Sequence, residues 1–188
     1  FAFAYNKTLF DEAGLEYPDP KNPYTWEEFV DVCKKLTMDK DGDGEIDQWG
    51  CANALQWALD AFIYTNGGHF LNEDQTLVVI DGQQEFIDAF QYFADLTCKY
   101  NVTPTVEQDT ALGGYQRWLD GQIGFYACGT WDVGAFMDKN TFPYEWGLCG
   151  WPVGKTGVSM TRNGSVGFAV SADTEYPEAA AALITLFS

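Results

Sequence analysis

Residues 25–50 read TWEEFVDVCKKLTMDKDGDGEIDQWG, and this stretch predicts a helix, an acidic loop and a strand in direct succession. Thr25 is followed three residues later by Glu28, the pattern of a capping box, which predicts that a helix begins here. Apolar side chains recur at helical spacing along residues 26–36, so this helix has one face to bury. The sequence QWGCA, residues 48–52, has the short apolar character of a strand. A helix and a strand placed so closely favour an α/β layered domain.

Outward from this stretch, helices and short strands alternate irregularly, which supports the α/β assignment over a sandwich or a bundle. Asp81 is expected to cap the longest helix. Helices are predicted over residues 6–15, 57–68, 82–101, 111–122, 131–138 and 175–187. Strands are predicted over residues 1–6, 77–80, 123–129, 145–153 and 165–173.

The charge of the chain limits its partners. The 188 residues carry 28 acidic and 10 basic side chains, a net charge of −18. This field repels a phosphate backbone and no Lys/Arg stripe offsets it, so nucleic-acid binding is not expected. An anionic membrane surface is disfavoured for the same reason. Aromatic residues make up 16% of the chain, a surplus that predicts rings facing a ligand or a partner surface.

The acidic loop has the ligand pattern of an EF-hand-type calcium site. With Asp39 as position 1, Asp41 and Asp43 stand at positions 3 and 5, and a glycine stands at position 6. Glu45 would offer its backbone carbonyl at position 7, and Asp47 stands at position 9. These residues predict a bound calcium ion.

The pattern departs from that motif at position 12, where Gly50 replaces the bidentate glutamate. The site must therefore borrow a ligand or bind calcium more weakly. The alternative is an acidic turn without metal, although such close carboxylates repel one another unless a cation neutralises them. A single loop followed by a strand does not suit a calcium sensor, so calcium, where bound, is expected to stiffen the loop.

Five cysteines are spread along the chain without CxxC spacing, and there is one histidine, so a zinc site is not expected. The cysteines are interpreted mainly as small buried apolar residues. One disulfide is possible in an extracellular protein, with a pairing that the spacing does not determine. The chain starts inside a strand pattern and stops inside a helix pattern, and it is interpreted as a fragment of a longer protein.

Several stretches in a fixed order resemble one known family. They are FAFAYNKTLFDEAGLEYP, the stretch at 25–50 quoted above, NGG at 66–68, RWLDGQIGFYACGTW and NGSVGFAVSADTEYPEAAAALI. The ordered set resembles the family 1 extracellular solute-binding proteins, which deliver sugars to ABC importers, and the resemblance covers nearly the whole chain. It implies one lobe of a two-lobed periplasmic-binding-protein-like (type II) fold. It further implies that residues 1–164 form the second lobe, and that residues 165–188 form a crossing strand and a helix returning toward a first lobe.

The resemblance also implies ligand-binding residues. It places one sugar-stacking aromatic shortly before NGG, at Trp57, and a second at the G-x-W turn, at Trp131. A sugar ring is recognised by an aromatic face against its C–H side and by polar groups on its hydroxyls. The polar candidates nearby are Asn53, Gln56, Asp132 and Asn163.

The function implied is binding without catalysis: a carbohydrate, probable in oligosaccharide form, is held between two lobes, and the closed form is recognised by a membrane permease. The protein is expected to be monomeric and extracellular, either periplasmic or anchored as a lipoprotein. One alternative is a carbohydrate-active enzyme, since 28 acidic residues always contain some pair of carboxylates. Another is a calcium-stabilised adhesion module, which would normally repeat the acidic loop.

Overall fold

The computed structural model describes residues 1–52, 55–161, 163–164 and 167–187, and the side chains of residues 55–57 and 187 lie outside this description. Its elements are, in chain order, β1 (Ala2–Asn6), α1 (Lys7–Glu12), α2 (Trp26–Leu36), β2 (Trp49–Cys51), α3 (Leu55–Asn66), α4 (Gln84–Cys98), α5 (Val106–Ala111), α6 (Gly114–Leu119), β3 (Ile123–Cys128), α7 (Val133–Met137), β4 (Trp146–Cys149) and α8 (Pro177–Phe187). The predicted α/β class is confirmed. No helix in the described ranges has the length and apolar character needed to cross a membrane.

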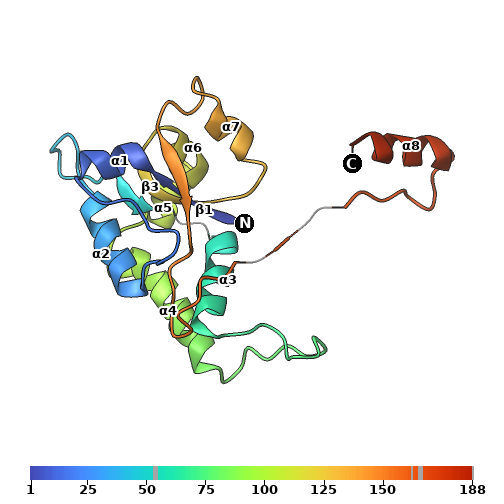
Figure 1. Cartoon of the computed structure of the whole chain (residues 1–188), viewed down its shortest axis with the longest axis horizontal. Coiled ribbons are helices and arrows are strands. Elements are labelled where there is room, and N and C mark those ends of the chain that lie inside the picture. Colours follow the sequence, from blue (N-terminus) through green and yellow to red (C-terminus); the bar gives the residue numbers. More distant parts are fainter. Residues whose placement is uncertain (53–54, 162, 165–166, 188) are drawn as a thin grey trace.

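The four strands form one mixed sheet in the order β2-β3-β1-β4. β1 runs antiparallel to both of its neighbours, and β2 runs parallel to β3. Each pair of neighbours is brought together from distant parts of the chain, with β1 at the start and β3 more than a hundred residues later. Helices cover both faces of this sheet (Figure 1).

Strand alternation in β1 explains the two layers of core. Phe3 and Tyr5 point into one apolar cluster, which the helices α1 to α4 close, while Ala4 points into the other. That second cluster includes Trp118 of α6 and Phe136 of α7. Because successive side chains of a strand point to opposite faces, a buried central strand must be apolar at every position.

The start of α2 forms as predicted. The Thr25 hydroxyl accepts a hydrogen bond from the Glu28 amide at 3.2 Å, and the Glu28 carboxylate accepts one from the Thr25 amide at 2.8 Å. Phe29, Val30 and Cys33 then lie on the buried face of the helix. The acidic loop leaves the end of this helix and leads into β2.

Three details of the sequence prediction are wrong. Residues 77–80 form only an isolated bridge, between Leu71 and Val78, because this arm has no strand of the sheet beside it. The helix predicted after Asp81 begins at Gln84, with Gln83 as a cap that makes no side-chain cap bond. The Gln83 side chain instead bonds backbone groups of His69 and Val79.

The end of the chain also differs from the prediction. Residues 167–173 form no strand, and residues 165 and 166 of the predicted strand lie outside the described residues. A strand needs a neighbour to hydrogen-bond with, and Figure 1 shows this segment running away from the sheet. It leads to α8, which stands apart from the rest of the molecule (Figure 1).

Candidate ligand-binding site

One edge of the sheet collects the ends of several strands. β2 and β3 are parallel, so their carboxyl ends lie at the same edge. Ala2, at the start of β1, pairs with Cys128, the last residue of β3. Phe3 pairs on its other side with Cys149, the last residue of β4. In α/β proteins, ligands bind beyond the carboxyl ends of parallel strands.

Trp131 stands at this edge, three residues beyond the end of β3. Its side chain is 61% exposed, an unusual state for so large an apolar ring. The indole lies directly over Gly129, where an added Cβ would fall 2.4 Å from the ring carbons. The ring of Phe1 meets it edge-on, with the centroids 5.4 Å apart and the planes at 74°. The indole is thus held from the side while much of its surface stays open.

Asp132 fixes the turn that carries Trp131. Its carboxylate accepts a hydrogen bond from the Gly129 amide at 3.0 Å, and its own amide donates to the Gly129 carbonyl at 3.1 Å. The residue is 8% exposed, and burial raises the pKa of its carboxyl, an effect that the Gly129 amide opposes. Asp132 therefore closes the turn and leads directly into α7.

Asn163 belongs to a segment that returns to the same edge. It is exposed, and two residues before it the Thr161 hydroxyl donates a hydrogen bond to the Phe1 carbonyl at 3.3 Å. Phe1 in turn contacts Trp131. Trp131, Asp132 and Asn163 are therefore placed around one end of β1.

The other three predicted ligand residues follow β2. Asn53 lies outside the described residues. Gln56 and Trp57 belong to the first turn of α3, and their side chains are not described. Their place in the chain is nonetheless informative, because the carboxyl end of β2 leads to the same sheet edge as Trp131.

Sequence reasoning missed two contributors to this edge. Phe1 is the side support of Trp131, and Gly129 provides the space beneath the indole. The G-x-W pattern carried the signal for Gly129, since a glycine two residues before an exposed ring allows the ring to fold back. No local signal identifies Phe1, because its contact spans the whole length of β3's pairing with β1.

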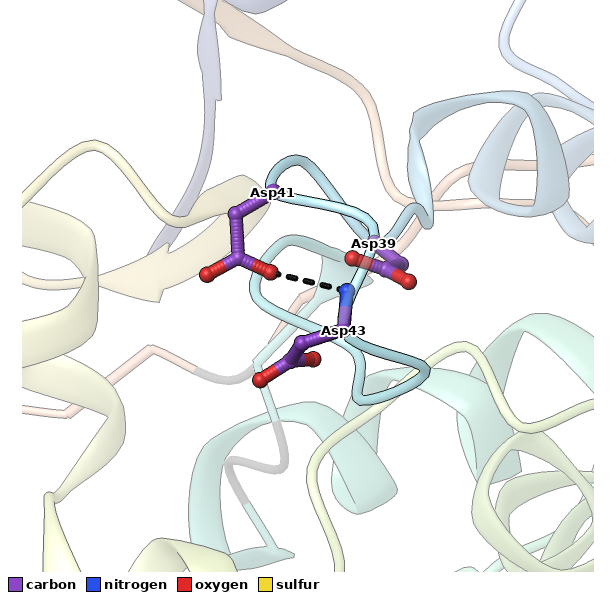
Figure 2. A group of neighbouring side chains, drawn as sticks. All are labelled: Asp39, Asp41 and Asp43. Atoms are coloured by element: carbon purple, nitrogen blue, oxygen red, sulfur yellow. Dashed lines mark hydrogen bonds between the residues drawn. The ribbon is translucent and has the colours of Figure 1, made fainter.

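The acidic loop lies elsewhere, between α2 and β2, and brings the carboxylates of Asp39, Asp41 and Asp43 together (Figure 2). One oxygen from each lies within 4.8 Å of the others. The amides of Gly44 and Gly42 donate to Asp39 at 2.8 and 2.6 Å and hold the pKa of its carboxyl below the ordinary value. The loop is thus arranged by its own backbone amides.

The remaining predicted metal ligands are placed as follows. Asp47 accepts hydrogen bonds from the amides of Lys40 and Asp41, which draws the end of the loop back over its start. Glu45 is exposed, and its amide donates to Asp43 at 2.8 Å. Gly50 lies in β2 and packs against Cys33 of α2, so the twelfth position of the motif is part of the core.

A separate recess of about 610 Å³ lies on the arm between α3 and α4 and is lined in part by Tyr64, His69 and Phe70. None of the residues predicted to bind ligand lines it. The recess is therefore distinct from the sheet edge that carries Trp131.

Comparison with solved structures shows which proteins share this fold. The ABC substrate-binding protein Lmo0181 from Listeria monocytogenes, in complex with cycloalternan, is 25% identical, with a TM-score of 0.77, and the match covers 100% of this chain and 45% of that one. The cyclic alpha-maltosyl-1,6-maltose binding protein from Arthrobacter globiformis is 25% identical, with a TM-score of 0.63 over 100% of this chain and 46% of that one. The maltotriose-bound domain MalE from Bdellovibrio bacteriovorus is 23% identical, with a TM-score of 0.69 over 98% and 46%.

The chain thus spans about half the length of the solved proteins that it matches, and it forms one lobe of their two-lobed fold. A search of curated protein sequences gave no match. The sequence profile of the bacterial extracellular solute-binding proteins matches residues 1–188. The chain therefore belongs to the bacterial extracellular solute-binding protein family.

Proposed function

We propose that this chain is one lobe of the solute-binding component of an ABC importer and that it binds a carbohydrate at the sheet edge around Trp131. The observation that carries the proposal is the exposed indole, held over Gly129 and beside Phe1 at the carboxyl end of β3. Aromatic faces of this kind bind the apolar C–H side of a sugar ring. The second wall of the cleft would come from a first lobe outside this chain.

The polar part of the site is assigned by role. Asn53, Gln56 and Asn163 are proposed to hydrogen-bond sugar hydroxyls, and Trp57 to stack on a second ring. Asp132 is proposed to position Trp131, because its carboxylate is already buried on the Gly129 amide. An oligosaccharide is the favoured ligand, since two stacking rings suit more than one sugar unit and the solved relatives include complexes with cycloalternan and maltotriose.

The proposed action is lobe closure without catalysis. A ligand that touches both lobes favours the closed form by its differential affinity for that form, and a membrane permease would recognise the closed form. The protein would act as a monomer outside the cytoplasm, either in a periplasm or anchored as a lipoprotein. Its charge of −18 gives nucleic acid no part in this function.

The test is tryptophan fluorescence of the two-lobed protein during titration with a panel of mono- and oligosaccharides, alongside Trp131→Ala. A saturable change that the variant loses supports the proposal. A folded protein that responds to amino acids or peptides and to no sugar would overturn it. Product analysis of the bound sugar after long incubation separates binding from hydrolysis.

We also propose that the acidic loop binds calcium as a structural ion. Asp39, Asp41, Asp43 and Asp47 would supply carboxylate oxygens, and Glu45 its carbonyl. The convergence of three carboxylates within 4.8 Å fits the oxygen ligands that calcium prefers. With no glutamate at the twelfth position, weak binding is expected. The ion would stiffen the connection between α2 and β2 and take no part in sugar recognition.

A further inference from the structure

Two cysteines from opposite ends of the acidic loop meet in the core. Cys33 of α2 and Cys51 of β2 are 0% and 3% exposed and belong to the same apolar cluster. The helix lies hard against the strand here: a Cβ on Gly50, the residue before Cys51, would fall 2.4 Å from the Cys33 Cβ and 2.5 Å from its Cα. A disulfide requires Cα atoms within about 7 Å of each other, and a backbone approach this close brings neighbouring cysteines into that range.

The two thiols also interact directly. Burial, followed by a hydrogen bond with the Cys51 thiol, raises the pKa of the Cys33 thiol well above its ordinary value. The folded protein therefore keeps Cys33 protonated and out of contact with solvent. A thiolate is the reactive species in disulfide exchange, so oxidation of this pair must occur before α2 docks on β2.

The other three cysteines lack such a partner by position. Cys128 and Cys149 lie on strands to either side of β1, in register with Ala2 and Phe3. Two strand spacings are about 9.5 Å, beyond the reach of a disulfide. Cys98 is exposed at the end of α4.

We propose that Cys33 and Cys51 form a structural disulfide in the extracellular protein. The bond forms by exchange with a disulfide-bearing oxidant of the extracytoplasmic space: each cysteine loses its proton, the two sulfurs join, and the oxidant is reduced to two thiols. Family membership places the chain in such a space, where disulfides persist. The inference does not depend on which solute the protein binds.

The bond would enclose residues 34–50, which contain the whole acidic loop. It would tie the end of α2 to β2 whether or not the loop holds a metal ion. A cross-link over a segment of this length constrains the unfolded chain, and reduction is expected to lower the melting temperature by about 6–12 °C.

The experiment is peptide mapping of the two-lobed protein after export from the cytoplasm. The protein is unfolded and alkylated without reductant, then digested with trypsin. We expect peptide 22–34, with Cys33, to be linked to peptide 41–99. Because peptide 41–99 also contains Cys98, the mapping is repeated in Cys98→Ser, where the link should remain.

Recovery of peptide 22–34 with Cys33 alkylated would overturn the proposal, as would loss of the link in Cys98→Ser. A second readout is the melting temperature with and without reductant. Cys51→Ala should abolish the response to reductant, and Cys128→Ala should retain it. Equal responses of the wild-type protein with and without reductant would contradict the account.

Discussion

Gly129 is the residue on which the position of the Trp131 ring depends. A Cβ at this position would fall 2.4 Å from three atoms of the indole, closer than such atoms approach in folded proteins. The ring belongs to an exposed turn, so it can swing away where the backbone of the core could not. A substitution here therefore moves the ring and leaves the fold in place.

Gly129→Ala is expected to weaken sugar binding by the two-lobed protein about 3- to 10-fold, the worth of one aromatic contact. The matched control is Gly134→Ala in α7, where an added Cβ meets no atom within 4 Å. That change should leave affinity unaltered and stabilise the helix by about 0.5–1 kcal/mol. Equal affinities of the two variants, measured by calorimetry, would contradict this account of Gly129.

Asp132 predicts a pH effect on stability. Burial raises the pKa of its carboxyl above the ordinary 3.8, so the folded state binds this proton more tightly than the unfolded state. The ionised group therefore destabilises the fold at neutral pH, and the penalty disappears as pH falls through the raised pKa. Asp132→Asn removes the penalty and can keep an acceptor for the Gly129 amide.

Asp132→Asn is therefore expected to melt above the wild-type protein near pH 7, with a difference that shrinks as pH falls to about 3.5. Thermal melts of both proteins across this range measure the effect. A difference that stays constant or grows toward low pH would contradict the assignment of the raised pKa to Asp132.

At the scale of the element, calcium should stabilise the loop between α2 and β2. Saturating calcium is expected to raise the melting temperature of the wild-type protein by about 5–10 °C over a chelator. Asp41→Asn should abolish most of this rise, and Asp31→Asn, on the exposed side of α2, should keep it. Differential scanning calorimetry gives the comparison. Identical melting of the wild-type protein in calcium and in chelator would exclude the structural role.

The elements also show what local sequence can predict. The start of α2 was predictable because the Thr25–Glu28 capping box is made within four residues. The strand at residues 77–80 was predicted from its apolar run, but a strand depends on a distant partner that the run does not specify. The short helix α5 (Val106–Ala111) buries no residue and so had no apolar stripe to reveal it.

At the scale of the molecule, α8 exposes apolar side chains without a neighbouring layer. Leu183 and Leu186 are 55% and 79% exposed, and Tyr176, just before the helix, is 70% exposed. Together with the separation of α8 in Figure 1, this supports the proposal that residues 165–188 return toward a first lobe. The helix would then bury its leucines only in the two-lobed protein.

Leu186→Ala is accordingly expected to cost the two-lobed protein about 2–4 kcal/mol of unfolding free energy. The same change in the 188-residue chain should cost under about 0.5 kcal/mol, since the side chain is exposed there. Urea unfolding of the four proteins provides the comparison. Equal costs in both contexts would contradict the proposed docking of α8.

The site could be predicted only in part for a reason of the same scale. The G-x-W turn marks Trp131 locally, but its support by Phe1 and the approach of Asn163 depend on the pairing of β1 with β3. Resemblance to a family supplied the order of these segments, and the sheet supplies their convergence.

The most direct test of the account is the calorimetric affinity of the two-lobed protein for the tightest-binding sugar of the panel, compared with Trp131→Ala and Trp26→Phe. Trp26 is half-buried and stacks on Tyr92 at 4.3 Å, so phenylalanine can preserve its packing. Trp131→Ala should lose at least tenfold in affinity while Trp26→Phe stays within about twofold. Unchanged affinity in a folded Trp131→Ala protein would contradict the claim that this sheet edge binds the sugar.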